Sequence, residues 1–262
     1  MNTRTSIAAI GVLFTLVATI AVPHRSAAQA TAMAAEKRAT VPFGAGERME
    51  YDVKFGALRV GNAHMEVVGL ENIRGRQAWH TAFWVQGGNF LYRVNDMYES
   101  WMDAQTLSSL RFVQQLQEGG KDTERRFEIY PDRAVFVQTS KKPAKEEASV
   151  SNPLDDGSFL YFLRTIPLVV GQTYDFNRYF RPDRNPVRIR VLRKERVSVP
   201  AGTFDAVVVQ PMIKTKGIFS ENGHAEVWLS DDDRHIMLQL KSKLSFGSLN
   251  LYLKSYVPSP NP

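Results

Sequence analysis

Apolar and polar residues alternate along most of this chain, and this alternation restricts its fold more than any other feature. In ERMEYDVKF, Met49, Tyr51, Val53 and Phe55 would point to one side and the charged residues between them to the other. A period of two is that of a β-strand, and a polar second face is typical of an antiparallel sheet with one side in water. Because about a dozen runs follow this pattern, we expect strands along most of the chain.

Short turns separate most of these runs. The turns consist of a few Gly, Asn or Asp residues, whereas parallel strands need a crossover of a dozen residues or more. We find no internal repeat and no sign of a second domain. The sequence therefore predicts an all-β fold with a single large antiparallel sheet of about a dozen strands and one or two short helices.

Two glycines are expected to shape these strands. In SVPAGTF, Pro200 fixes φ at the first turn position and Gly202 can adopt a positive φ at the end of a three-residue loop. Val199 would then face Thr203. Gly61 lies where the apolar phase changes from even to odd positions, which indicates a β-bulge.

One segment has helical spacing instead. NPLDDGSFLYFLRTIP places four apolar side chains on a helical face after Asp155 as a capping residue and before Pro167 as a stop. These four are Phe159, Leu160, Phe162 and Leu163. We predict a helix over 156–164 on the concave side of the sheet, because so short a helix is stable only when tertiary contacts bury it. GGNFLYRVND is expected to form a helical turn or a loop.

The N-terminus has the three parts of a secretory signal peptide. A short basic start is followed by an apolar run, shorter than the roughly 20 residues of a spanning helix, and by a small-residue cleavage site at Ala30. We therefore expect a signal peptide at 1–30, a flexible leader at 31–46, the β domain at 47–257 and a disordered tail at 258–262. The protein would reside in the periplasm or be secreted, with no transmembrane segment after cleavage.

Composition excludes several classes of chemistry. The chain has no cysteine, so it has no disulfide, no thiolate nucleophile and no cysteine metal site. Its formal charge is +6, and without Arg4 and Arg25 of the signal peptide the charge is 31 − 27 = +4. Because the basic residues are dispersed among acidic ones, nucleic acid is not an expected partner.

No catalytic or metal-binding motif stands out. The histidines lack the spacing of paired zinc ligands, and no nucleophile elbow, phosphate loop or dinucleotide fingerprint is present. Asp96 and Glu99, three residues apart on a strand, would point to opposite faces and could not act as a carboxylate pair. We therefore expect no catalytic residue, no metal ion and no cofactor.

Aromatic residues gather between positions 79 and 101. Trp79 and Phe83 would share one strand face and Trp84 would take the other. One explanation is a core sheet under a loop, and the other is an apolar groove open to a hydrophobic or lipid ligand. For the second, the candidate ligand-binding residues are Trp84, Phe90, Tyr92, Tyr98 and Trp101.

Register arithmetic predicts an ion pair next to this group. If MYESWMDAQTLSSLRFV forms two strands around a loop near 104–106, facing residues sum to 210 and Glu99 faces Arg111. Glu99 would be partly desolvated and would need that cation. We predict a structural ion pair between the two. A four-residue loop would change the sum to 211 and place Glu99 opposite Phe112.

Four blocks, in this order, resemble the bacterial domain of unknown function 3108. They begin VNDMYESWMDAQ, NPLDDGSFLYFL, VSVPAGTFDAVV and AEVWLSDDDRHI, and the resemblance covers roughly residues 45–256. It implies an exported, mostly β envelope protein without an established activity. More loosely, the arrangement is similar to the lipoprotein-carrier fold, which implies a strongly curved sheet or incomplete barrel around helices and says little about function.

We therefore expect an exported, non-enzymatic envelope protein, a binding or envelope-maintenance module for a hydrophobic or amphiphilic ligand. An outer-membrane β-barrel, which also alternates, is one alternative. A hydrolase of envelope glycans or lipids is the other. Oligomeric state does not follow from the sequence.

Overall fold

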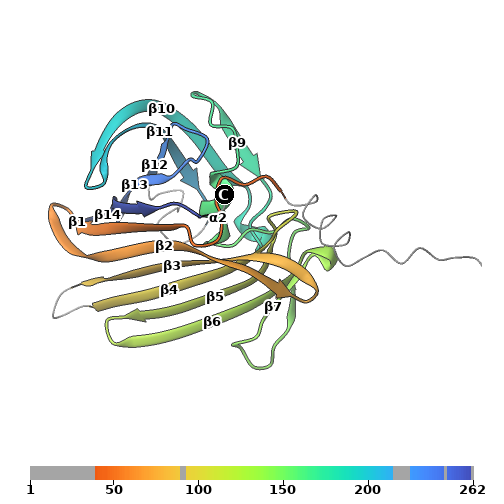
Figure 1. The fold of residues 1–262 in the computed structure, drawn as a ribbon. Helices are drawn as coiled ribbons and strands as arrows, with labels where there is room; N and C mark the ends of the chain where they lie inside the picture. The colour runs from red at the N-terminus through yellow and green to blue at the C-terminus, as the bar shows by residue number, and fades with distance from the viewer. Residues whose placement is uncertain (1–38, 89–92, 215–224, 245–246, 261–262) are drawn as a thin grey trace, which may run out of the picture. The chain divides into compact units, whose positions relative to one another are not determined.

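A single antiparallel sheet makes up the fold, as expected (Figure 1). The computed structural model describes residues 39–88, 93–214, 225–244 and 247–260. Within them, fourteen strands lie in the order β8-β7-β6-β5-β4-β3-β2-β1-β14-β13-β12-β11-β10-β9. The sheet is strongly curved but not closed, because β8 and β9 form its two edges. One short helix and two 3-10 turns accompany it.

The strands fall into two runs of sequential neighbours. The first run is β1 (Arg48–Phe55), β2 (Leu58–Ile73), β3 (Arg76–Gly88), β4 (Arg93–Asp103), β5 (Ser109–Glu118), β6 (Lys121–Tyr130), β7 (Val135–Gln138) and β8 (Glu146–Ala148). The second run is β9 (Thr173–Phe176), β10 (Val187–Val199), β11 (Gly202–Met212), β12 (Glu226–Ser230), β13 (Met237–Leu244) and β14 (Gly247–Val257). The 3-10 turns are η1 (Pro131–Arg133) and η2 (Pro182–Arg184).

The first and last strands join the two runs. β1 pairs with β14 along its whole length, from Arg48 opposite Val257 to Phe55 opposite Leu249. Within each run, every strand pairs antiparallel with the next strand along the chain. The pairing of β1 with β14 joins the two runs into one sheet. The crossover between β8 and β9 contains the helix.

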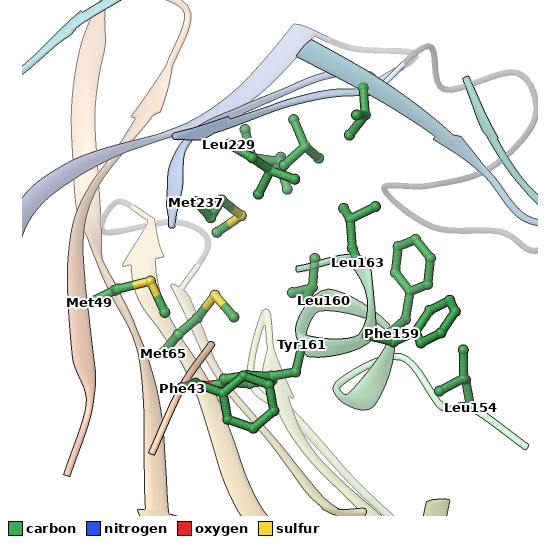
Figure 2. Close-up of a cluster of buried hydrophobic side chains, with 14 of the residues drawn as sticks. Phe43, Met49, Met65, Leu154, Phe159, Leu160, Tyr161, Leu163, Leu229 and Met237 are labelled. Atoms are coloured by element: carbon green, nitrogen blue, oxygen red, sulfur yellow. The ribbon is translucent and has the colours of Figure 1, made fainter. Parts of the chain in front are cut away.

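Helix α2 (Ser158–Leu163) fills the inner side of the curved sheet. All six of its residues are buried. Figure 2 shows Leu160 and Leu163 pointing into a cluster with side chains from the sheet, including Met65 and Leu229. The predicted helix is confirmed, although it begins at Ser158. Asp155 acts as its capping residue, because its carboxylate accepts hydrogen bonds of 2.8 Å from the backbone N–H groups of Gly157 and Ser158.

The two predicted glycine features are present, one with a correction. Gly202 has φ 139°, but Val199 faces Gly202 rather than Thr203, so the loop has two residues and not three. At Gly61 the pairing of β1 with β2 shifts by one residue, which confirms the bulge. A Cβ there would lie 2.0 Å from the carbonyl oxygen of Gln86, so the position also requires glycine for close strand approach.

Parts of the expected leader and tail belong to the folded core. Phe43 is 3% exposed and its ring lies 5.1 Å from that of Tyr161. Ser259 is buried and donates a hydrogen bond of 2.9 Å to the carbonyl oxygen of Ala45. Phe43 and Ser259 therefore pack against the rest of the domain, although they lie within the predicted leader and tail. Residues 1–38, including the expected signal peptide, lie outside the described residues.

A buried ion pair connects these segments. Glu47 and Arg164 are each 1% exposed, and Arg164 donates hydrogen bonds of 2.5 and 3.0 Å to the two carboxylate oxygens. Arg164 also donates to the carbonyl oxygens of Pro42 and Arg234. The Tyr256 hydroxyl donates to Glu47 over 3.2 Å. One pair therefore links the N-terminal segment, the end of α2, the β12–β13 loop and β14.

Removal of one member of this pair is expected to destabilise the protein more than removal of both. Arg164→Met leaves the Glu47 carboxylate buried without its cation, at a cost of about 4 kcal/mol in the free energy of unfolding. Arg164→Met with Glu47→Gln should cost about 1 kcal/mol less than the single change, because no buried charge remains. Denaturant unfolding measures both.

The matched control is a pair at the surface. Arg188 and Asp175 lie 2.7 Å apart with side chains 43% and 45% exposed, so Arg188→Met should cost at most about 1 kcal/mol. A double variant less stable than Arg164→Met would contradict the prediction.

Candidate functional site

Strands β3, β4 and β5 have two chemically different faces. The inner face contributes Trp79, Met102 and Phe112 to the core around α2. The outer face carries a smaller buried cluster of Ile73, Ala78, Trp101, Leu110 and Val113. Candidate sites must therefore be sought on each face separately.

The aromatic residues proposed to bind a ligand do not form one surface. Trp84 and Trp101 lie on the outer face, where the Trp84 indole donates a hydrogen bond of 2.8 Å to Asn95. Tyr98 lies on the inner face, stacked against Phe83 at 6.1 Å between ring centroids. Phe90 and Tyr92 lie outside the described residues. The predicted separation of Trp84 from Trp79 and Phe83 is confirmed.

The predicted ion pair between Glu99 and Arg111 is wrong. Glu99 faces Val113, and Arg111 faces Trp101, so facing residues sum to 212. Arg111 instead donates to Glu128 on β6 over 2.6 Å. Glu99 and Arg111 therefore lie on the same face, as expected, but Arg111 is two residues away from the position opposite Glu99.

A longer loop and a bulge explain this register. The backbone N–H of Asp103 donates to the carbonyl oxygen of Ser108, so the loop has four residues. The pairing then shifts once more between Trp101 and Met102, opposite Leu110. Arg74 holds the Leu110 carbonyl oxygen at 2.8 Å. The longer loop and the bulge each raise the sum of facing residue numbers by one, from 210 to 212.

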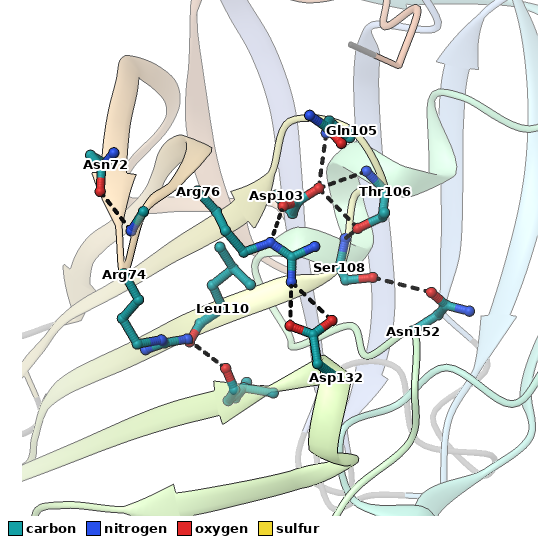
Figure 3. A network of polar contacts seen from close by, with 12 residues as sticks. Asn72, Arg74, Arg76, Asp103, Gln105, Thr106, Ser108, Leu110, Asp132 and Asn152 are labelled. Carbon is teal, nitrogen blue, oxygen red and sulfur yellow. Dashed lines mark hydrogen bonds and ion pairs between the residues drawn. The ribbon is translucent and has the colours of Figure 1, made fainter. Parts of the chain in front are cut away.

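Asp103 maintains the shape of that loop. Its carboxylate accepts hydrogen bonds from the backbone N–H groups of Gln105 and Thr106, and from Arg76 at 2.7 Å. Figure 3 shows Arg76 lying between Asp103 and Asp132 of η1. Every carboxylate oxygen here has a structural partner, so we assign this network to the fold and not to a site.

The side chain that pairs with Glu99 is a histidine. His80 lies between two carboxylates, with Nδ1 2.7 Å from Glu71 and Nε2 3.0 Å from Glu99. Its ring stacks on Trp101 at 4.3 Å between centroids, and the Trp101 indole donates to Glu71. Burial by itself would lower the pKa of His80, but the hydrogen bonds to Glu99 and Glu71 outweigh it and raise the pKa above its usual value.

This raised pKa predicts a pH-dependent stability. His80 stabilises the fold fully below its ordinary pKa of about 6.5, and this contribution disappears as pH rises through the higher pKa of the folded state. The melting temperature should therefore fall less between pH 7 and pH 9 in His80→Gln than in the unmodified protein.

His64 provides the control, because burial lowers its pKa and gives the opposite sign. His64→Gln should retain the decrease in melting temperature between pH 7 and 9. Equal decreases in the unmodified protein and His80→Gln would refute the assignment.

The inner face is covered unevenly by the helix. Next to α2, Met65 and Thr81 are 1% and 2% exposed. Toward the β3–β4 turn, apolar side chains that pack against the core are only half-buried. We define the inner-face patch as Val60, Phe83, Val85 and Tyr98.

Two carboxyl groups border the patch, those of Asp96 on β4 and Glu118 at the end of β5. Asp96, which faces Val85, is 6% exposed and accepts a hydrogen bond of 3.1 Å from the backbone N–H of Gln117. Burial raises the pKa of Asp96 to about 6, and the nearby Glu118 carboxylate adds to the rise. Burial also raises the pKa of Tyr98, with Asp96 contributing. One border of the patch therefore has a carboxyl group, that of Asp96, with a pKa close to neutral pH.

Asp96 is expected to cost stability at neutral pH. An acid with a raised pKa favours folding least when ionised, so stability is lost as pH rises from about 4 to about 6. Asp96→Asn cannot ionise and keeps the acceptor for Gln117, so above pH 6 it should be more stable by about 1 kcal/mol, allowing for screening. Thermal unfolding at pH 4 and 8 measures the difference.

Asp205→Asn serves as the control, because that side chain is 76% exposed. It should change the free energy of unfolding by less than about 0.5 kcal/mol at both pH values. An Asp96→Asn protein no more stable than the unmodified one at pH 8 would contradict the assignment.

A second polar group lies at the other border, around Asp156. The Asp156 carboxylate accepts hydrogen bonds from Gln114 at 3.2 Å and from the Tyr179 hydroxyl at 2.7 Å. Arg184 donates to the same hydroxyl over 3.0 Å. Burial raises the pKa of Asp156, and the interactions with Tyr179, Arg184, Arg181 and Arg125 reduce that rise.

The sequence analysis did not anticipate this group. Arg178, Arg181 and Arg184 recur every three residues in NRYFRPDRNP, which is an unusually basic stretch for a crossover segment. That spacing was the available signal. Its meaning depended on Gln114 and Asp156, which lie far away in sequence.

No metal site or membrane-spanning helix accompanies these groups in the part of the chain that the structure describes. No group of three or more histidine or acidic side chains there could hold a metal ion. No helix among the same residues has the length and apolar character needed to cross a membrane.

Comparisons with known proteins identify a family and one similar fold. The family model "Protein of unknown function (DUF3108)" matches residues 50–254, and the chain belongs to this family. No curated protein matches the chain. The β-barrel-like DUF1849 protein of Brucella abortus has a similar fold, with 11% identity and a TM-score of 0.56 over 84% of this chain and 99% of that one.

A more distant similarity links the chain to a candidate lipoprotein from Parabacteroides distasonis. The identity is 12% and the TM-score 0.37, over 83% of this chain and 99% of that one. At 11% identity the similarity to the Brucella abortus protein concerns the fold and does not assign a function.

Proposed function

We propose that this protein is an exported, non-enzymatic component of the bacterial cell envelope that binds a hydrophobic or amphiphilic ligand. The ligand would lie on the inner-face patch. The protein would act in the periplasm or outside the cell, as the N-terminal pattern indicates.

Uneven coverage of the inner face is the observation that carries this proposal. Helix α2 buries one end of the apolar face, while Phe83, Val85 and Tyr98 at the other end remain half-buried. An incompletely covered apolar face next to a completed core is typical of a surface that binds apolar molecules. The stacked rings of Phe83 and Tyr98 offer a flat contact for an acyl chain or ring.

A binding role also agrees with the polar groups nearby. Asp103 and Asp155 have complete sets of structural partners, and His80 lies on the outer face, away from the patch. No arrangement of nucleophile, base and orienting group is found among the described side chains. A non-enzymatic role is therefore supported because these titratable groups either hold the backbone in place or lie away from the patch.

Binding of Nile red, a neutral apolar dye, tests the proposal. The unmodified protein should enhance its fluorescence with a dissociation constant in about the micromolar range, and dodecanol should compete. Val85→Asp should abolish the enhancement, because a charge within the patch repels apolar molecules.

The control variant removes an aromatic residue from the opposite face of the same strand. Trp84→Gln should leave dye binding intact, since Trp84 lies on the outer face. Circular dichroism verifies that both variants are folded. Absence of dye binding in the unmodified protein, or its loss in Trp84→Gln alone, would refute the proposed surface.

A further inference from the structure

The inner-face patch continues into a basic region along one row of the sheet. Phe83 faces Tyr98, Tyr98 faces Gln114, and Gln114 faces Arg125, on strands β3 to β6. Neighbouring strands are about 4.8 Å apart, so Arg125 begins about 10 Å from Tyr98. One molecule of modest length can therefore contact both the apolar and the basic part of the row.

Two further guanidinium groups, those of Arg184 and Arg181, approach the same part of the sheet from the crossover segment between β8 and β9. Arg184 donates to Tyr179, whose hydroxyl donates to Asp156, and Asp156 accepts from Gln114. Arg125 donates to the amide oxygen of Gln114 at 3.4 Å. A hydrogen-bonded chain thus joins Arg125 of the sheet to Arg184 of η2.

Arg181 approaches from the aromatic side. Its guanidinium carbon lies 5.5 Å from the ring centroids of Phe127, Phe136 and Phe180. Phe127 belongs to β6, two residues beyond Arg125. Neither Arg125 nor Arg181 forms a salt bridge with any carboxylate that the structure describes, so their positive charges are not neutralised by direct pairing.

The charge around the patch is therefore asymmetric. Three guanidinium groups surround the Asp156 carboxylate, whose neighbour in the chain is the buried Asp155, at one border. At the other border lie the carboxyl groups of Asp96 on β4 and Glu118 at the end of β5. An anion is attracted to the first border and repelled by the second. A cationic headgroup would be repelled by three guanidinium groups, and a neutral headgroup would accept hydrogen bonds from them without the added attraction between opposite charges.

We propose that the ligand is an amphiphile with an anionic headgroup, which Arg125, Arg181 and Arg184 bind while its apolar part covers the inner-face patch. This inference rests on the proposed function and adds the chemistry of the headgroup. Guanidinium groups match the geometry of phosphate and carboxylate oxygens, so a phosphate or carboxylate headgroup fits best.

Three twelve-carbon amphiphiles below their micellar concentrations test the inference: dodecyl phosphate, dodecyl maltoside and dodecyltrimethylammonium. Isothermal titration calorimetry should show dodecyl phosphate binding about tenfold more tightly than dodecyl maltoside, and the cation binding most weakly. Arg125→Gln with Arg184→Gln should reduce the preference for phosphate to about twofold and preserve binding of the maltoside. Arg125→Gln alone, a change at an exposed side chain, should give an intermediate preference.

Arg126→Gln is the matched control. Arg126 is the next residue on β6 but lies on the outer face, where it pairs with Glu124. Its removal lowers the net charge of the protein by the same amount as Arg125→Gln and should leave the preference for dodecyl phosphate unchanged.

Each remaining outcome has a distinct meaning. Equal affinity for the three amphiphiles, or a preference that survives in the double variant, overturns the anionic headgroup and leaves the proposed function standing. Absence of binding by all three overturns the proposed function. Displacement of dodecyl phosphate by inorganic phosphate, beyond the effect of chloride at equal ionic strength, overturns the amphiphile and indicates a site for free anions.

Discussion

The buried ion pair between Glu47 and Arg164 is the interaction on which the arrangement of this fold depends. Two charges at 1% exposure are stable only when each is fully paired, so all segments that complete their coordination must be in place together. Those segments are the N-terminal stretch before β1, the end of α2, the β12–β13 loop and β14. The pair therefore positions the helix on a sheet whose edges, β8 and β9, do not meet.

The position of the helix has a consequence at the opposite end of the inner face. A six-residue helix is too short to cover strands as long as β2 and β3, with 16 and 13 residues. The same tertiary contact that completes the core near Met65 leaves Phe83, Val85 and Tyr98 half-buried. In this fold the candidate binding surface is the part of the core that the helix does not reach.

The face of the sheet on which each strand side chain lies, and the capping of the helix by Asp155, could be predicted, and the structure confirms both. Alternation separated Trp79 and Phe83 from Trp84, and the Asp155 cap identified α2. Register could not be predicted, because it depends on an additional loop residue and on a bulge at Leu110. The carbonyl oxygen of Leu110 is held by Arg74, 36 residues earlier in the chain. A shift of two residues preserves the face of every side chain, which explains why the predicted faces were right while the pairing of Glu99 was wrong.

The sequence by itself determined which side chains share a face, roughly where the chain turns, and that a short helix follows Asp155. These properties follow from the two-residue period of a strand and from hydrogen bonds within a few residues, so neighbours along the chain are sufficient to specify them. The tertiary structure alone decided that Trp101 stacks on His80 while Tyr98 joins the inner face beside Phe83, and that three arginines gather around Asp156. These contacts join residues far apart in the sequence, and their geometry exists only after the sheet has curved around α2.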